Sequence, residues 1–383
     1  MYGAITCAAG YRTEEQKTMK KKVIKTVVSI VIFLSLLAMI VAYLGPLVRP
    51  RNSDFDDWQY FYAEDNNTLN VVLTGSSALY RYWIPAMGYE EQGFTSGMIS
   101  QSCQTIHAVP YIMEEALKTQ KVDLFVVEVR QAAVEMVQDD KDVAKENYYL
   151  SMVCAGMKPS LTRMHLVHDL LVPTDDDKEL EWQIPLLKYH ENFFDIYSGD
   201  WLNRLQEGKN AYKGLRVKSL VEKQSQEPLT DPADLSDYSA LSESVRGALD
   251  KIVETGEKNN VQVLFISTPY FYSQQRYTVQ CALNAYMEAK GYPYLNMDKP
   301  EIKEALALDE NTDFYNSRHV NFAGAEKVTH FFAEWLNEHY EFADRLNEKQ
   351  KKEWKKAVEN WDKKEKELTK LWIRNCENAS EAE

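Results

Sequence analysis

Short apolar runs alternate along most of this chain with longer segments in which apolar residues recur every three to four positions. The short runs are typical of buried parallel strands, and the longer segments are typical of helices that cover a sheet. The predicted strands are 70–75, 92–95, 122–129, 261–267 and 294–297, with a turn at 96–101. The predicted helices are 78–87, 105–119, 237–259, 273–290 and 324–340. This alternation predicts an α/β fold with a doubly wound parallel sheet, in which a right-handed crossover places the third strand beside the first.

An uncharged apolar stretch near the amino end, from Thr26 to Leu44, predicts a transmembrane helix. At about 1.5 Å per residue it reaches roughly 28 Å, close to the thickness of a bilayer core. Lysines crowd its amino side, so the positive-inside rule predicts a cytoplasmic tail at 1–22, an anchor at 23–44 and an exported remainder. A cleaved signal peptide is the alternative, but the apolar run is longer than such a peptide needs.

Three further segments flank or interrupt the α/β domain, which we place at 68–342. Residues 45–67 are predicted to form a stalk, and the aromatic, polar segment 139–237 is predicted to be a helical insertion that covers the mouth of the sheet. Residues 343–383 are rich in Lys and Glu and predict a charged amphipathic helix with an aromatic seam. That helix packs either on its own domain or on a partner protein or membrane surface.

Composition excludes several classes of function. The formal net charge is −14 and no basic stripe occurs beyond the N-terminal region, which excludes a nucleic-acid binder. The five cysteines are scattered and indicate neither a zinc site nor a disulfide framework, although one or two disulfides remain an alternative. His165, His168 and His190 lack acidic or cysteine companions at metal-ligand spacing, so no metal is expected, and no acyl-CoA or other cofactor signature occurs.

Candidate chemistry lies where the first strand ends. The run 70–74 stops at Gly75-Ser76-Ser77, which places hydroxyl groups at the sheet edge where parallel sheets bind ligands. A serine becomes a useful nucleophile only when a base takes its proton, and His319, about 240 residues later, directly precedes the last predicted helix of the domain. Each residue also has a structural interpretation, since small residues turn chains and loop histidines bond to backbone.

These two stretches resemble the SGNH/GDSL hydrolases, and in particular their membrane-anchored bacterial members. The family block Gly-Asp-Ser corresponds to Gly75-Ser76-Ser77, and the block Asp-x-x-His corresponds to residues 316–319. The aspartate is replaced in both blocks, by Ser76 and by Asn316. The resemblance extends from about Leu69 to Tyr340 and implies a flavodoxin-like three-layer fold.

The resemblance also implies roles for residues. Ser77 corresponds to the nucleophile and His319 to the general base, while Asn316 takes the place of the residue that orients the imidazole. An amide accepts the same hydrogen bond as a carboxylate but carries no charge. Asp313 either supplies the missing carboxylate or, in the interpretation we favour, caps a turn.

Other site residues follow from the same comparison. Backbone N–H groups of Ser77 and Gly97 are the family-consistent oxyanion donors, and Gln101 is the candidate replacement for the family's Gly-x-Asn-Asp side-chain donor, which does not follow the third strand here. Glu128 and Arg130, at the end of that strand, form either a structural ion pair, the interpretation we favour, or a substrate contact. A further candidate substrate contact is His190, in a segment similar to one in Gram-positive members.

The leading functional expectation is a membrane-tethered, extracytoplasmic bacterial acyl esterase or O-acyltransferase that acts on a cell-envelope glycan or other acylated polymer. Its resemblance to polysaccharide O-acetyltransferase and D-alanyl-transfer proteins implies a multi-pass membrane acyltransferase as a partner. The alternative is a catalytically weakened member that serves as a binding or scaffold subunit of an envelope-modifying membrane complex. The two replaced aspartates favour this alternative, and retention of the serine and the histidine disfavours it.

Overall fold

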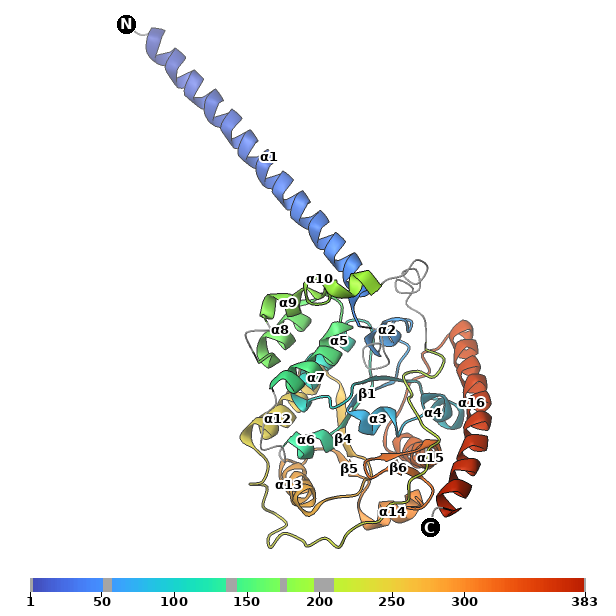
Figure 1. The fold of residues 1–383 in the computed structure, drawn as a ribbon. Helices are drawn as coiled ribbons and strands as arrows, with labels where there is room; N and C mark the ends of the chain where they lie inside the picture. Colours follow the sequence, from blue (N-terminus) through green and yellow to red (C-terminus); the bar gives the residue numbers. More distant parts are fainter. Residues whose placement is uncertain (1–2, 51–56, 136–142, 173–177, 196–209, 382–383) are drawn as a thin grey trace. The chain divides into compact units, whose positions relative to one another are not determined.

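The computed structural model describes residues 3–50, 57–135, 143–172, 178–195 and 210–381. These residues fall into two compact units. The smaller unit combines Met1–Arg49 with Leu180–Leu205, and the larger combines Pro50–Glu179 with Gln206–Glu383 and contains the sheet (Figure 1). The segment predicted as one insertion, 139–237, is therefore divided between the two units.

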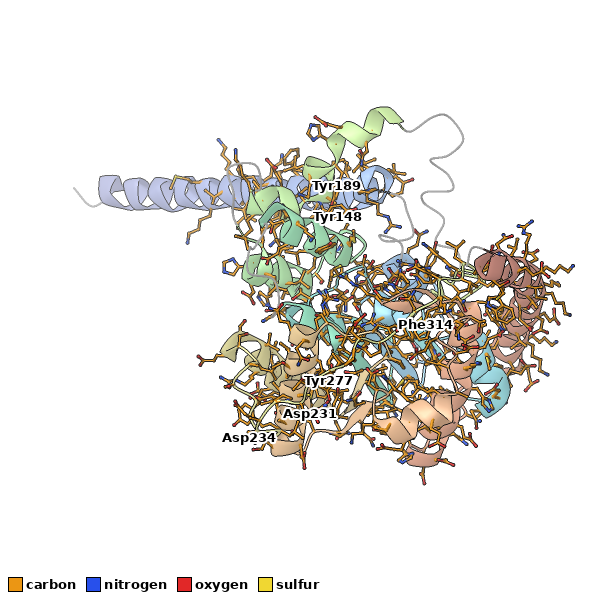
Figure 2. All side chains as sticks on the ribbon, turned by 60° about the horizontal axis from the view of Figure 1, so that its bottom comes forward. Tyr148, Tyr189, Asp231, Asp234, Tyr277 and Phe314 are labelled. Atoms are coloured by element: carbon orange, nitrogen blue, oxygen red, sulfur yellow. The ribbon has the colours of Figure 1, made fainter. Side chains whose placement is uncertain are left out.

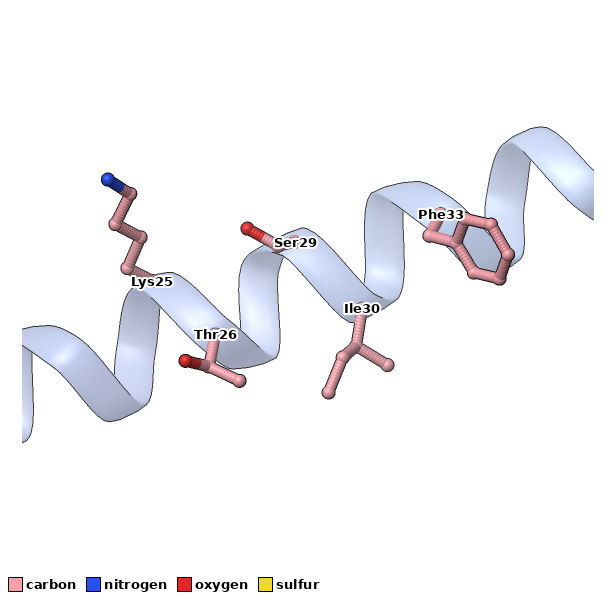
Figure 3. A pocket seen from close by; sticks show the side chains of 5 residues that line it. All are labelled: Lys25, Thr26, Ser29, Ile30 and Phe33. Atoms are coloured by element: carbon pink, nitrogen blue, oxygen red, sulfur yellow. The ribbon is translucent and has the colours of Figure 1, made fainter.

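The smaller unit is built on one long helix, α1 (Gly3–Val48), which runs without a break through the predicted tail and anchor. Its stretch Met19–Gly45 is long and apolar enough to cross a membrane. Figure 3 shows part of this surface, where Lys25 gives way to uncharged side chains that stand out from the helix, such as Phe33, which is 64 % exposed. The short helices α10 (Pro185–Lys188) and η2 (His190–Asp195) contact α1.

Five parallel strands form the sheet of the larger unit, in the order β2-β1-β3-β4-β5. Their bounds are β1 (Val71–Gly75), β2 (Ser96–Ser100), β3 (Leu124–Glu128), β4 (Gln262–Ser267) and β5 (Tyr294–Asn296). The third strand lies beside the first, as the sequence predicts. This order is that of flavodoxin-like sheets, whose ligands bind at the carboxyl edge of the strands.

Helices cover both faces of the sheet. Alternate residues of a strand point to opposite faces, and Leu73 of β1 and Val126 of β3 join a core with α3 (Ser77–Tyr80), α4 (Pro85–Gln92) and α15 (Phe322–His339). The other face carries α5 (Val109–Ala116), α12 (Glu243–Asn259) and α13 (Gln274–Lys290). The larger unit is thus a three-layer α/β structure, as predicted.

The remaining elements connect these layers or lie outside them. They are α2 (Asp57–Tyr62), η1 (Ile106–Ala108), α6 (Arg130–Glu135), α7 (Val143–Ala155), α8 (Leu161–Leu170), α9 (Glu179–Gln183), α14 (Pro300–Leu306), α16 (Glu348–Glu381) and the antiparallel pair β6 (Phe314–Asn316) and β7 (His319–Val320).

Two predicted elements near the first strand are wrong. Residues 92–95 do not form the second strand: Gln92 ends α4, and Gly93 adopts the left-handed conformation (φ 78°) that commonly ends helices. The strand is Ser96–Ser100, which was expected to be part of the turn that follows. The helix predicted at 78–87 is divided into α3 and α4, because Pro85 is suited to the first turn of a new helix.

Part of the predicted stalk belongs to the folded unit. Residues 51–56 lie outside the described residues, but α2 packs on β2, and Phe61 is buried. The indole nitrogen of Trp58 donates to the Val153 carbonyl oxygen at 2.8 Å. The larger unit therefore includes residues from Asp57 on, and not only from residue 68.

The C-terminal helix α16 packs on its own unit. Its seam residues Trp354, Trp361 and Leu368 are all buried. The Trp354 ring lies 5.0 Å from that of Tyr89 on α4, which Figure 1 shows beside α16. Of the alternatives for this helix, the structure therefore shows docking on its own domain.

This docking predicts a stability effect. Replacing a buried tryptophan removes apolar contacts and leaves a cavity, so Trp354→Ala should lower the free energy of unfolding by about 3–5 kcal/mol. Urea unfolding of the full chain in detergent measures the change. Lys355→Ala, at an exposed position of the same helix, is the control and should change it by about 0.5 kcal/mol or less. Equal stability of the two variants would show that α16 does not pack as described.

Candidate functional site

Ser77 stands at the carboxyl edge of the sheet because β1 ends in a tight turn into α3. A Cβ on Gly75 would come within 2.6 Å of the Glu128 Cβ, so only glycine fits at the end of the strand. Ser76 is the N-cap residue of α3, and its Oγ accepts from the Ala78 N–H at 3.3 Å. The same hydroxyl donates to Glu128 Oε2 at 2.9 Å, which ties the turn to the neighbouring strand β3.

His319 is carried to the same place by the β6–β7 hairpin. An extended segment, residues 210–242, which we call the strap, runs past this hairpin (Figure 1). The Glu222 N–H donates to the Phe314 carbonyl oxygen at 2.9 Å. At its far end the strap is tied to α13, where Tyr277 donates to Asp231 at 2.7 Å; Figure 2 shows these two side chains together.

Tyr82 fixes the loop that precedes His319. Its hydroxyl lies 2.7 Å from the carbonyl oxygen of Pro269 and 3.0 Å from that of Arg318. The phenol is buried, and burial raises its pKa to about 12, so it remains protonated and able to donate. The loop that carries the imidazole is therefore held from a residue only five positions after Ser77.

The hydroxyl and the imidazole are in direct contact. Ser77 Oγ lies 2.8 Å from His319 Nε2, and His319 Nδ1 lies 3.0 Å from Asn316 Oδ1. The same Asn316 oxygen accepts from the Arg318 N–H at 2.9 Å, which identifies it as the acceptor end of the amide. An acceptor there requires a proton on Nδ1, so Nε2 is left free to accept the proton of Ser77.

The residue behind the imidazole is the predicted amide and not Asp313. Asp313 is buried, and its Oδ2 accepts from the Asp309 N–H at 2.8 Å and lies 2.7 Å from Lys327 Nζ. These contacts place it in the loop before β6, as the turn interpretation expects. The arrangement around the imidazole is thus Ser77–His319–Asn316.

Cations surround the imidazole. The Tyr315 ring stacks on that of His319 with centroids 5.4 Å apart, and Arg81 and Lys218 lie over the Tyr315 ring at 5.6 and 4.9 Å. Burial, followed by the nearby Arg130 and the other cations, lowers the pKa of His319 to about 2. The imidazole is therefore neutral at physiological pH, the form that a general base requires.

Glu128 and Arg130 do not form the ion pair that was favoured for them. Glu128 is buried, and its Oε1 accepts from the backbone N–H of Arg130 at 2.7 Å while Oε2 accepts from Ser76. The guanidinium turns away and lies 4.6 Å from the Tyr270 ring centroid, with Nη1 3.3 Å from the Tyr82 hydroxyl. Among the described residues no carboxylate contacts it. Glu128 therefore anchors the Ser77 turn, whereas the guanidinium faces the site.

Three other predicted site residues are placed as follows. Gly97 is paired with Val72 inside β2, and its Cα faces Leu69, so the structure does not bring it to Ser77. Gln101 directly follows β2; its N–H donates to the Gly75 carbonyl oxygen at 3.2 Å, and its buried side-chain amide makes no hydrogen bond with a described residue.

His190 belongs to the other unit. There its Nδ1 lies 2.7 Å from the Leu187 carbonyl oxygen, and the side chain is exposed. Within the described side chains, no group of three or more His, Cys, Asp or Glu residues is arranged to hold a metal ion.

A hollow of about 620 Å³ lies at the opposite edge of the sheet. Lys121, Asp123 and Gln262, at the amino ends of β3 and β4, are among the residues that line it. The hollow is therefore not the candidate site. We place that site at the contact between Ser77 and His319.

Several site residues were missed by sequence reasoning. Tyr82, Tyr315 and the cations Arg81, Lys218 and Arg318 come from three separate segments, and no local pattern connects them. The positions of Tyr315 and Arg318 within the histidine block were the only available signal. The hairpin that brings them together has strands of three and two residues, too short to predict from periodicity.

The buried neutral imidazole predicts a pH effect on stability. Below its usual pKa of 6.5 a histidine of the unfolded chain takes up a proton, whereas folded His319 remains neutral down to about pH 2. Its contribution to the free energy of unfolding should therefore be complete above pH 6.5 and decline as the pH falls towards 2. In His319→Gln this part of the pH dependence should be absent. Unfolding measured from pH 4 to 8 compares the two proteins, and identical profiles would contradict the described environment.

The sequence was compared with protein-family models and with curated proteins. No protein-family model matches the sequence, and no curated protein matches it. The assignment of function therefore rests on the chemistry of Ser77, His319 and Asn316 in the larger unit.

Proposed function

We propose that this protein is an SGNH-type serine acyl esterase or O-acyltransferase. The observation that carries the proposal is the 2.8 Å contact between Ser77 Oγ and His319 Nε2, with Asn316 behind the ring. A nucleophile in contact with a base that a third group orients is the arrangement that acyl transfer by serine requires. It lies at the carboxyl edge of a parallel sheet, where such sites form.

The proposed reaction has two steps. Ser77 Oγ attacks the carbonyl carbon of an ester while its proton passes to His319 Nε2. The ester C–O bond then breaks, and the imidazolium returns the proton to the departing alcohol oxygen, leaving an acyl group on Ser77. Water or a sugar hydroxyl attacks that acyl group, gives its proton to His319 and releases Ser77, which regains the proton.

The developing oxyanion needs hydrogen-bond donors. We assign this role to the backbone N–H of Ser77 and to the side-chain amide of Gln101, which directly follows β2 beside the Ser77 turn and whose buried NH₂ group makes no hydrogen bond with a described residue. Gly97 is not retained in this role because it lies inside β2.

The substrate we propose is a cell-envelope glycan or another acylated polymer. The support is the apolar stretch Met19–Gly45 of α1, because a membrane tether keeps an enzyme close to the envelope. The lysines before it favour a cytoplasmic N-terminus and an extracytoplasmic α/β unit. A transferase of this kind would work with a multi-pass membrane acyltransferase that supplies the acyl group.

A second candidate function is favoured by Asn316. Because an amide stabilises an imidazolium less than a carboxylate does, the chain is also suited to serve as a binding or scaffold subunit that has lost most of its activity. Catalysis is preferred because the serine, the base and the orienting hydrogen bond are all in place.

The proposed function predicts ester hydrolysis that depends on the pair. The full chain in detergent should hydrolyse 4-nitrophenyl acetate, and Ser77→Ala or His319→Ala should lower kcat/KM by about a thousandfold, because each removes one member of the nucleophile–base pair. Release of 4-nitrophenol measures the rate.

Matched controls separate this result from general damage. Ser225→Ala and His165→Ala alter exposed residues and should retain the activity of the unmodified chain. Absence of hydrolysis by a correctly folded chain would favour the scaffold function. Hydrolysis that persists in Ser77→Ala would exclude the mechanism.

A further inference from the structure

Four basic residues gather around the Ser77–His319 pair, and we call them the cation cluster. They come from four separate parts of the chain: Arg81, Arg130, Lys218 and Arg318. The whole chain, by contrast, is acidic, with 58 Asp and Glu against 44 Lys and Arg. The candidate site therefore carries a local excess of positive charge, although the chain as a whole is negatively charged.

The cluster is arranged by aromatic rings. Tyr315, which stacks on His319, carries Arg81 on its ring at 5.6 Å and Lys218 at 4.9 Å. Arg130 lies between Tyr82 and Tyr270, at 5.6 and 4.6 Å from their ring centroids. Aromatic rings thus hold these three cations, and the buried Glu128 and Asp298 carboxylates act electrostatically on Arg130 without pairing with it.

No member of the cluster forms an ion pair with a carboxylate of a described residue. Cations just outside it do: in the strap, Lys213 Nζ lies 2.6 Å from Glu64 Oε1, and Arg216 pairs with Asp57. Lys218, two positions after Arg216, lies over the Tyr315 ring and forms no ion pair with a described residue. The Arg81 Nε group is buried and makes no hydrogen bond with a described residue.

Like charges that converge without a paired carboxylate cost stability, so an arrangement of this kind indicates that an anion completes it. Guanidinium groups match the geometry of carboxylates and phosphates. We infer that this site takes acyl esters whose carrier also bears a carboxylate or phosphate group, and that the cation cluster holds that group beside the scissile ester. The inference rests on the proposed acyl-transfer function.

Such a group would act on the chemistry as well as on binding. The cations oppose protonation of His319, and a bound anion offsets their charge, so the imidazole becomes a better base when the correct substrate is present. Discrimination should therefore affect kcat as well as KM.

The test uses the full chain in detergent and two matched pairs of substrates at one pH and ionic strength. Acetylated glucuronic acid is compared with its neutral methyl ester, and acetylated glucose 6-phosphate with acetylated glucose, by release of acetate. We expect kcat/KM to be at least about tenfold higher for the anionic member of one pair or both, which also distinguishes carboxylate from phosphate.

Variants of the exposed cations connect this preference to the cluster. The double variant Arg318→Gln, Lys218→Gln should bring the anionic-to-neutral ratio close to one, whereas Lys355→Gln, on the outer side of α16, should retain the ratio of the unmodified chain. Equal rates for charged and neutral esters, or a ratio that survives in the double variant, would overturn the inference.

Binding of inorganic phosphate, measured by calorimetry, separates this inference from the proposed function. If no ester is hydrolysed but phosphate binds and the double variant weakens it at least about tenfold, the acyl-transfer function fails and the anion site stands. If esters are hydrolysed without charge preference and phosphate does not bind, acyl transfer stands and the anion site is refuted.

Discussion

The contact between the Ser77 hydroxyl and the His319 imidazole, 242 residues apart in the chain, is the interaction on which the proposed chemistry depends. Each side of it is held by separate structure. A glycine-limited turn that Glu128 anchors through Ser76 presents the hydroxyl, and a short hairpin fixed by Tyr82 and the strap presents the imidazole. Because both supports lie at the carboxyl edge of one parallel sheet, the fold brings the hydroxyl and the imidazole together before any ligand arrives.

The electrostatics of this contact differ from those of a serine site with a full acidic partner. Asn316 fixes the tautomer but supplies no charge, and the surrounding cations disfavour the imidazolium. The ring therefore has a neutral amide behind it and cations around it, and no carboxylate of a described residue contacts it. This lack of negative charge around the imidazole is why a scaffold function competes with the catalytic one. An anionic substrate would supply the charge. The same observation thus gives the site both its apparent weakness and its proposed selectivity.

Strong apolar runs of buried parallel strands predicted the layers of the fold, and the end of the first run marked Ser77 at the ligand edge. His319 and Asn316 were joined to it by the resemblance to a hydrolase family. Prediction from the sequence failed where the apolar signal is absent. Ser96–Ser100 is a buried strand in which only Met98 and Ile99 are large and apolar, too short a run to stand out, and its pairing with β1 shows its state. The cation cluster has no local pattern, since its members are brought together by tertiary contacts. The preference for an ion pair between Glu128 and Arg130 failed because sequence proximity does not give side-chain direction.

Covalent labelling tests the central claim most directly. A fluorophosphonate reacts with a serine only when a neighbouring base activates the hydroxyl, and the modified residue is found by mass spectrometry of peptides from the full chain. We expect a single adduct on Ser77 that is lost in His319→Ala. No adduct on Ser77 in the folded protein, or undiminished labelling of Ser77 without His319, would contradict it.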